Sequence, residues 1–430
     1  MGNFSKQTEK MAKSIKIIVL LSLYYYLLTW GYENMIIPKW EYQGFVNEAS
    51  TGNFILSFVG VSLSIFTFII LDKKNTPSAM VMNLFNLLFY IPLYVFVAYT
   101  ETVSGFVLFC MLYQLALFLF YLFLPISFRP LLPRSKRYFT FIISFVLIAT
   151  LFINGIYNGF KLKFDLDDVY ENRLAVRDIS MPSIFNYIKS SSYFVGIIAL
   201  IYGLKIRNWS FVAFVTLVQL MSFAFGASKT QFFSIFICFI AFFFYTEKLR
   251  LWAPVSLLLL IGISIMEFKI FSTTEISDIW ARRSLFVPVK ISYSMYDFFE
   301  TPGREFLYLR GSVFRFLGFE DPYATQEGFQ RMIGFMLSGK EATNANTGLL
   351  GNDYAQFGWW SLLVFPFLRI YLLRMYDYCA EGVDRRIVVV LSIFIAFTYI
   401  SGAFFTVLIT NGILLVNYLL YCFPRDKNYE

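Results

Sequence analysis

The chain has 430 residues and a formal net charge of +8, with 58% apolar, 21% aromatic and only 15% charged residues. Because soluble domains carry roughly 25% charged residues, this composition excludes an ordinary soluble globular protein. In a soluble protein the basic balance would indicate nucleic acid. In a membrane protein, cytoplasmic loops rich in Lys and Arg explain it, and we expect no nucleic-acid partner.

The sequence contains no histidine and only four cysteines. The lack of histidine excludes His metal ligands, His general bases and Ser-His-Asp or Cys-His catalytic sites. Cys110, Cys238, Cys379 and Cys422 show no metal-binding spacing, so we expect neither a disulfide nor a metal site, and no pattern indicates a cofactor. No cleavage site follows the first apolar run, so we expect that run to remain as a helix.

Apolar runs of about 20 residues recur along the chain, and each is long enough to cross a bilayer as a helix. Backbone polar groups must be satisfied inside lipid, so helices are the structure that suits such uniformly apolar runs. The sequence therefore predicts an all-α, polytopic integral membrane protein with about twelve transmembrane helices. The predicted segments are Ile15–Tyr32, Phe54–Leu71, Ala79–Tyr99, Val103–Leu124, Tyr138–Tyr157, Ile184–Leu204, Trp209–Phe225, Phe232–Tyr245, Leu251–Met266, Tyr354–Leu373, Ile387–Ile400 and Phe404–Phe423.

Basic residues alternate between the connections. Those rich in Lys and Arg are the N-terminal stretch and residues 72–74, 129–137, 205–207, 247–250, 369–386 and 425–427. The connections at 33–52, 100–102 and 401–402 are poor in Lys and Arg. The positive-inside rule then places both termini in the cytoplasm and the two longest connections, 158–182 and 268–353, on the outer face.

The longer of these, Phe268 to Asp353, organises the chain. It separates residues 1–267, which hold helices 1 to 9, from residues 354–430, which hold helices 10 to 12. A loop of this length is functional or disordered, and its many aromatic residues argue against disorder. We therefore interpret residues 268–353 as a large outer-face functional loop between helices 9 and 10.

Two patterns in this loop predict amphipathic helices. Pro288 suits the first turn of a helix whose apolar stripe is Val289, Tyr293, Tyr296 and Phe299. The second stripe is Phe329, Met332, Ile333 and Met336. Such helices pack on the bundle or rest at the lipid headgroups, and either placement would roof a cavity between the spans.

Positive residues on the outer face act against the positive-inside bias and need a reason. They are Lys161, Lys163, Arg173, Arg177, Lys229, Arg282, Arg283, Lys290, Arg304, Arg310, Arg315, Arg331 and Lys340. The plain interpretation is solvated surface paired with local acids. For Lys229 and the Arg282/Arg283 pair we favour an anion-binding role, because arginine offers phosphate a planar, permanently charged fork. The candidate general bases are Asp297, Glu300, Glu305, Asp321 and Asp353.

The loop also carries a resemblance to a known family. Its residues are Arg282-Arg283, Val287-Pro288, Tyr293 and Tyr296-Asp297-Phe298-Phe299, then Asn344-Ala345-Asn346-Thr347-Gly348 and Asp353-Tyr354-Ala355-Gln356-Phe357-Gly358. With Ser228-Lys229-Thr230 before a helix, this pattern resembles the Wzy-type repeat-unit polymerases of bacterial O-antigen and capsule synthesis. The likeness covers the topology from end to end and the local sequence over roughly 80 residues.

The resemblance implies a metal-independent glycosyltransferase that joins undecaprenyl-diphosphate-linked oligosaccharides at the outer face of the bacterial cytoplasmic membrane. The product would be O-antigen, capsule or exopolysaccharide. A hydroxyl of a new unit would attack the anomeric carbon of the growing chain, and undecaprenyl diphosphate would leave. Besides these glycans, the bilayer and a chain-length regulator protein are the implied partners.

In this reaction we assign Arg282 and Arg283 to stabilising the negative charge of the leaving diphosphate. We assign Asp297 and Asp353 to accepting the proton of the attacking hydroxyl as general bases. The substrate-binding residues would be Lys229, Arg173, Arg177, Tyr293, Tyr296, Asn346 and Tyr354. The alternative role for Asp353 is an N-cap of the tenth span.

Other functions remain alternatives. A flippase or transporter of lipid-linked sugars would show repeated halves and ionisable residues buried in the membrane. We find almost no such residues; the spans hold polar residues such as Asn83, Asn86, Gln114 and Gln219. An O-antigen ligase is expected to use a histidine, and the absence of histidine from this chain counts against that function. A structural scaffold would not need the outer arginines, which counts against a purely structural role.

Overall fold

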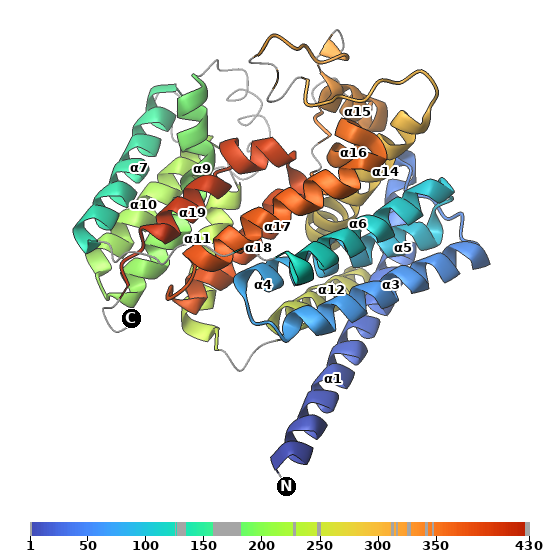
Figure 1. Cartoon of the computed structure of the whole chain (residues 1–430), viewed down its shortest axis with the longest axis horizontal. Helices are drawn as coiled ribbons and strands as arrows, with labels where there is room; N and C mark the ends of the chain where they lie inside the picture. Colours follow the sequence, from blue (N-terminus) through green and yellow to red (C-terminus); the bar gives the residue numbers. More distant parts are fainter. Residues whose placement is uncertain are drawn as a thin grey trace. The chain divides into compact units, whose positions relative to one another are not determined.

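The computed structural model describes residues 2–124, 126, 135–157, 182–226, 229–246, 251–310, 314, 317–324, 328–339, 343–345 and 348–425. Within these ranges all regular secondary structure is helical (Figure 1). The chain divides into two units. Unit 1 is Met1–Pro125, Lys248–Leu372 and Ala396–Phe404, and unit 2 is Ile126–Glu247, Leu373–Ile395 and Phe405–Glu430.

Eight helical runs in the described part are long and apolar enough to cross a membrane. They are Met11–Gln43, Thr51–Asp72, Pro77–Tyr99, Gly105–Phe123, Lys136–Tyr157, Ile184–Lys205, Trp252–Phe271 and Gly351–Cys379. Two shorter apolar helices are Trp209–Phe225 and Thr230–Phe244. The protein is therefore a helical, multi-pass membrane protein, as predicted, whereas the number twelve and the sidedness stay predictions.

Unit 1 begins with α1 (Gly2–Gly31), which continues through the wider helical stretch η1 (Tyr32–Ile36) into α2 (Ile37–Trp40) and η2 (Glu41–Gln43). The next helices are α3 (Thr51–Asp72), α4 (Pro77–Phe85), η3 (Asn86–Tyr90), α5 (Ile91–Tyr99), α6 (Ser104–Phe123) and α12 (Trp252–Phe271). After α12 come α13 (Glu275–Ser277), η4 (Asp278–Phe286), α14 (Val287–Glu300), α15 (Phe329–Ser338), α16 (Gly351–Phe357), η7 (Gly358–Trp360) and α17 (Ser361–Cys379), whose last residues belong to unit 2.

The core of unit 1 surrounds α5, in which every residue is buried. Its Tyr94 ring packs against Gly60 of α3, where no larger residue would fit. The Tyr94 hydroxyl donates to Gln114, and the Gln114 amide donates to Ser64 and Asn86 at 2.9 Å each. Polar side chains in an apolar interior pair with one another because water is absent, so this network links α3, η3, α5 and α6.

Three of the wider helical stretches stand just before prolines. The π-helical stretches η1, η3 and η4 each end two residues before Pro38, Pro92 and Pro288, respectively. Proline has no N–H to donate, and its ring collides with the carbonyl four residues earlier, so the preceding turn widens. Pro288 lies in the first turn of α14, as predicted, and η4 leads into α14 without a break, so the helical path runs from Glu275 to Glu300.

Unit 2 is built around α9 (Ser183–Lys205), which packs against α7 (Lys136–Tyr157), α10 (Trp209–Gly226), α11 (Lys229–Phe244) and α19 (Ile413–Tyr421). It also includes the first part of α18 (Arg385–Ser401) and η8 (Thr406–Thr410). Gly196 lets the Gln219 amide approach α9 and donate to the Ser192 carbonyl at 3.3 Å.

The ninth and twelfth predicted segments are among those that differ from the observed helices. The ninth, Leu251–Met266, continues to Phe271, so the predicted start of the long loop falls inside α12. The twelfth, Phe404–Phe423, is interrupted between η8 and α19 at Gly412, whose φ of +87° takes the backbone out of the helix.

The two predicted amphipathic helices exist as α14 and α15. In α14 the predicted stripe is buried except for Tyr293, which is half-buried, and residues on the other faces are buried as well. In α15 three of the four stripe residues are buried, whereas Met336 is 63% exposed.

Candidate anion-binding site

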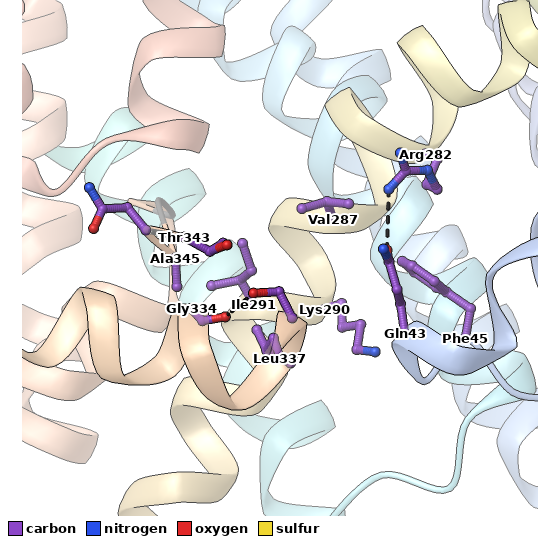
Figure 2. Close-up of a pocket in the computed structure, with 12 residues that line it drawn as sticks. Gln43, Phe45, Arg282, Val287, Lys290, Ile291, Gly334, Leu337, Thr343 and Ala345 are labelled. Carbon is purple, nitrogen blue, oxygen red and sulfur yellow. Dashed lines mark hydrogen bonds between the residues drawn. The ribbon is translucent and has the colours of Figure 1, made fainter. Parts of the chain in front are cut away.

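A cavity of about 200 Å³ opens within unit 1 where three stretches of sequence meet. One wall is the end of η2 with the connection that follows it, another is η4 and α14, and the third is α15 with residues 343–345 (Figure 2). Its lining residues are Gln43, Phe45, Arg282, Val287, Lys290, Ile291, Gly334, Leu337, Ser338, Thr343, Asn344 and Ala345. Two of these side chains are cationic, and none of the described lining residues carries a carboxylate.

Arg282 supplies the first cation and is only 7% exposed. Its guanidinium stacks on the Trp40 ring at 3.5 Å from the ring centroid, and one terminal nitrogen donates to Gln43 at 3.3 Å. The Nε atom has no hydrogen-bond acceptor among the described residues and lies 3.7 Å from the Asp278 carboxylate. Burial lowers the pKa of Arg282, with the Asp278 charge opposing the shift, yet arginine stays a cation near neutrality.

Asp278 offers Arg282 little further bonding capacity. One of its oxygens accepts a 2.6 Å hydrogen bond from the Trp40 indole, and the other pairs with Lys39. Arg282 is therefore a buried cation with part of its hydrogen-bonding capacity unused. A buried charge in that state is unfavourable unless a ligand or water completes it.

Lys290 supplies the second cation from about two turns further along the same helical path. The structure shows no hydrogen bond or ion pair for it within the described part of the chain; its nitrogen lies 4.9 Å from the Phe45 ring centroid. Burial lowers the pKa of Lys290 to about 8. Gly44, at φ +76°, leaves room for the ammonium, because a Cβ there would lie 2.5 Å from Lys290 Nζ.

These features fit a small anion. A guanidinium fork and an ammonium facing one cavity without a carboxylate match phosphate oxygens in geometry and charge. The cavity has the volume of about seven water molecules at roughly 30 Å³ each, which suits one or two phosphate groups.

The structure separates the two predicted arginines. Arg282 lines the cavity, whereas its neighbour Arg283 is exposed and is not part of the lining. Asp297 is exposed on α14, seven residues beyond Lys290. At a rise of 1.5 Å per residue, that places Asp297 about 10 Å further along the helix axis.

The three predicted tyrosines gather on another face of α14. The Tyr296 and Tyr354 rings are buried with centroids 4.3 Å apart, and the Tyr354 hydroxyl donates to the exposed carboxylate of Glu300. Burial raises the pKa of Tyr296 to about 12. Tyr293 is half-buried and packs against Phe106 with centroids 5.1 Å apart. None of these tyrosines lines the cavity.

Asp353 is fully buried, and its carboxylate accepts hydrogen bonds from Arg369 and Tyr113. It lies in the first turn of α16 without capping it, since the N-cap position is Leu350 and no side chain caps that end. Arg369, which the charge pattern assigned to a cytoplasmic connection, instead lies buried within the membrane-crossing run Gly351–Cys379. The expectation that the spans hold almost no buried ionisable residues is therefore corrected by this pair.

Four predicted binding residues fall wholly or partly outside the described part of the chain. Arg173, Arg177 and Asn346 lie outside the described residues, and for Lys229 only the backbone, at the start of α11, is described.

Sequence reasoning missed the roles of Lys290, Trp40 and Gln43. Lys290 was only one of many outer-face cations, and nothing in its surroundings along the chain distinguishes it. Trp40 and Gln43 are more than 230 residues away from Arg282, as the separations of 238 and 239 for the Trp40–Asp278 and Gln43–Arg282 bonds show. The signal available was a Trp and a Gln three residues apart at the C-terminal end of the first apolar run, Met11–Gln43.

Comparisons with known proteins return no match among family models, curated proteins or solved structures. The functional assignment therefore depends on the chemistry of the cavity and on the resemblance in the sequence pattern.

Proposed function

We propose that the protein is a polymerase of lipid-diphosphate-linked oligosaccharide repeat units, acting at the outer face of the bacterial cytoplasmic membrane. The observation that carries the proposal is the cavity lined by Arg282 and Lys290, two cations whose bonding capacity the described residues leave unfilled. Electrostatic stabilisation of a leaving diphosphate is what this reaction asks of its enzyme. The sequence resemblance supplies the substrate class.

In the proposed reaction the hydroxyl oxygen of the acceptor unit bonds to the anomeric carbon of the donor. The bond from that carbon to the diphosphate oxygen breaks, and the lipid diphosphate leaves with both bonding electrons. Arg282 and Lys290 bind the leaving diphosphate. The hydroxyl proton ends on the released diphosphate or on solvent.

This arrangement assigns no general-base role to Asp297 or Glu300. The anomeric carbon is joined directly to the diphosphate, so a base must stand within hydrogen-bond reach of the attacking hydroxyl beside it. Along α14, Asp297 and Glu300 stand about 10 and 15 Å beyond Lys290. Asp353 is likewise unsuited, because Arg369 and Tyr113 already occupy its buried carboxylate.

The test compares neighbouring arginines. Cells producing Arg282→Ala, Arg282→Lys or Arg283→Ala are assayed for polymer length and for the amount of membrane-inserted protein. Losing a charge-assisted hydrogen bond costs about 1.5–3 kcal/mol, so we expect Arg282→Ala to reduce polymerisation by about 10- to 100-fold. Arg282→Lys keeps the charge and recovers part of the activity, while Arg283→Ala stays near wild type. Normal polymer from a well-inserted Arg282→Ala protein would contradict the proposal.

A lipid-linked oligosaccharide flippase is the second candidate, because the Asp353–Arg369 pair is buried in a membrane-crossing run. The two functions differ in where a gene deletion leaves the substrate. A missing polymerase leaves single units on the outer leaflet or a one-unit product, whereas a missing flippase leaves them on the inner leaflet.

A further inference from the structure

The buried pair of Arg369 on α17 and Asp353 on α16 bonds to more than itself. Both side chains are 0% exposed. Arg369 donates to both oxygens of Asp353, to the Tyr113 hydroxyl at 2.7 Å, and through Nη2 to the Gly348 carbonyl at 2.9 Å. One guanidinium therefore joins α16, α17 and α6 to the turn that contains Gly348.

A buried ion pair of this kind contributes little to the stability of the folded protein. Removing two charges from water is unfavourable, and well-packed apolar residues in the same place are often equally stable or more so. Breaking the pair by removing one partner is different, because a lone buried charge remains. The role of the pair is therefore indicated by its other contacts, those with Tyr113 and Gly348.

The backbone at Gly348 and Leu350, beside the pair, is constrained by its neighbours. The Gly348 N–H donates to the Ile400 carbonyl at 3.0 Å, and a side chain at Gly348 would collide with the Gly402 carbonyl. Leu350 has a φ of +73°, a left-handed conformation that is strained for a leucine. Such strain persists only when surrounding contacts hold it, and the bond from Arg369 to Gly348 is one of them.

The cavity wall lies close to Gly348 along the chain. Thr343–Ala345 lines the cavity and ends three residues before Gly348, a span of at most about 11 Å of chain. The Ala345 N–H donates to the Gln330 carbonyl at 2.9 Å, and the Thr343 carbonyl packs directly against Gly334 of α15. On the other side of Gly348, the Leu349 carbonyl accepts a 3.3 Å bond from Ser292, two residues from Lys290 on α14.

We propose that Arg369 is a positioning residue of the anion site: with Asp353 it fixes the turn at Gly348 and thereby holds the 343–345 wall against α15 and the Lys290 helix. The expected effect of Arg369 on anion binding rests on the proposed function of the cavity. The expected effect of Arg369 on the position of residues 343–345 does not depend on that function.

The decisive variant removes both charges together, Asp353→Leu with Arg369→Met, so that no lone buried charge remains. Protein in lipid nanodiscs is assayed for thermal stability and for binding of inorganic pyrophosphate, beside wild type and Arg282→Ala. We expect a melting temperature near or above that of wild type and a pyrophosphate affinity at least tenfold lower. Affinity within twofold of wild type in the folded double variant overturns the inference.

Two further measurements cover the remaining outcomes. If the double variant does not fold, Arg369→Lys decides, since lysine keeps the charge but lacks the fork whose two terminal nitrogens reach Tyr113 and the Gly348 carbonyl separately. Normal affinity in that variant overturns the inference. Disulfide formation in a Gln330→Cys, Ala345→Cys pair reports the wall directly and should fall severalfold when the charge pair is removed. Unchanged cross-linking in the double variant overturns the inference, whether or not the wild-type protein binds pyrophosphate. A wild-type protein that binds no pyrophosphate refutes only the proposed role of the cavity.

Discussion

Gly44 and Lys290 lie so close that a Cβ on the glycine would stand 2.5 Å from the lysine nitrogen. Gly44 also has a φ of +76°, so alanine there brings both a collision and backbone strain. We predict that Gly44→Ala lowers sulfate affinity by about tenfold, or about 1.4 kcal/mol, because the ammonium must leave its place in the cavity. Calorimetric titration of nanodisc-embedded protein measures this change.

Gly303→Ala is the matched control for that prediction. Gly303 has a similar φ of +85°, but nothing lies within 4 Å of a Cβ built there. It therefore introduces comparable backbone strain without moving a cation. Equal loss of sulfate affinity in both variants would assign the effect to strain and remove Lys290 from the site.

Anion binding should weaken at alkaline pH. Burial lowers the pKa of Lys290 to about 8, and a bound anion raises it again by favouring the charged amine. Affinity is therefore complete below pH 8 and falls as the pH rises through that value, by up to about tenfold per pH unit. Sulfate is the suitable probe, because its own charge is constant over this range, at fixed ionic strength.

The control for the pH dependence is Lys290→Met, which should bind sulfate weakly and with a flat profile between pH 7 and about 9.5. Arg282 keeps its charge throughout, so it contributes no slope. A wild-type profile that is flat over the same range would show that Lys290 does not meet the anion.

Stacking of the Arg282 guanidinium on Trp40 should contribute to anion affinity more than a lysine at position 282 would. The guanidinium lies 3.5 Å from the Trp40 ring centroid, and such contacts contribute about 0.5–2 kcal/mol. We predict that Trp40→Leu lowers sulfate affinity by about 2- to 30-fold and that the same change in an Arg282→Lys protein has a clearly smaller effect. A double-mutant cycle measures this coupling.

Trp40 also donates to Asp278, and Trp40→Phe separates the two contacts, since phenylalanine keeps a ring but loses the N–H. Near-wild-type affinity in the phenylalanine variant supports stacking as the cause. Equal and additive losses in both arginine and lysine backgrounds would show that Trp40 acts on folding instead.

The predicted sidedness can be tested with cysteine labelling. A cysteine at Glu320, an exposed residue of the long connection, should react with a membrane-impermeant maleimide in intact cells. A cysteine at Lys73, in a connection predicted to be cytoplasmic, should react only after permeabilisation. The four native cysteines are buried, so background labelling is low. The reverse pattern would place the cavity on the inner side and exclude the proposed polymerase.

The helices could be predicted from the sequence because apolar runs of bilayer length have few alternatives in lipid. The wider stretches before Pro38, Pro92 and Pro288 could also have been anticipated, since the cause is local. The place of Pro288 in the first turn of α14 is predictable for the same reason, since proline is common there.

The site could be predicted only in part, because its contacts join distant parts of the chain. The sequence drew attention to Arg282 but gave no means of separating it from Arg283; one residue of helical rotation decides which of them faces the cavity. Likewise, Arg369 was assigned to the cytoplasmic charges nearby, since only the folded chain shows Asp353 beside it.

The wide stretch η4, nine residues from Asp278 to Phe286, determines in which direction the side chains upstream of Pro288 point. A π-helical turn accommodates an extra residue relative to an α-helix, so it behaves as an insertion that the helix has absorbed. Relieving the constraint with Pro288→Ala would let the turn tighten with its residue count unchanged, and everything upstream would then rotate by up to about 100°. Arg282 would then face away from Lys290, so the angular offset between the two cations depends on a proline that does not itself line the cavity.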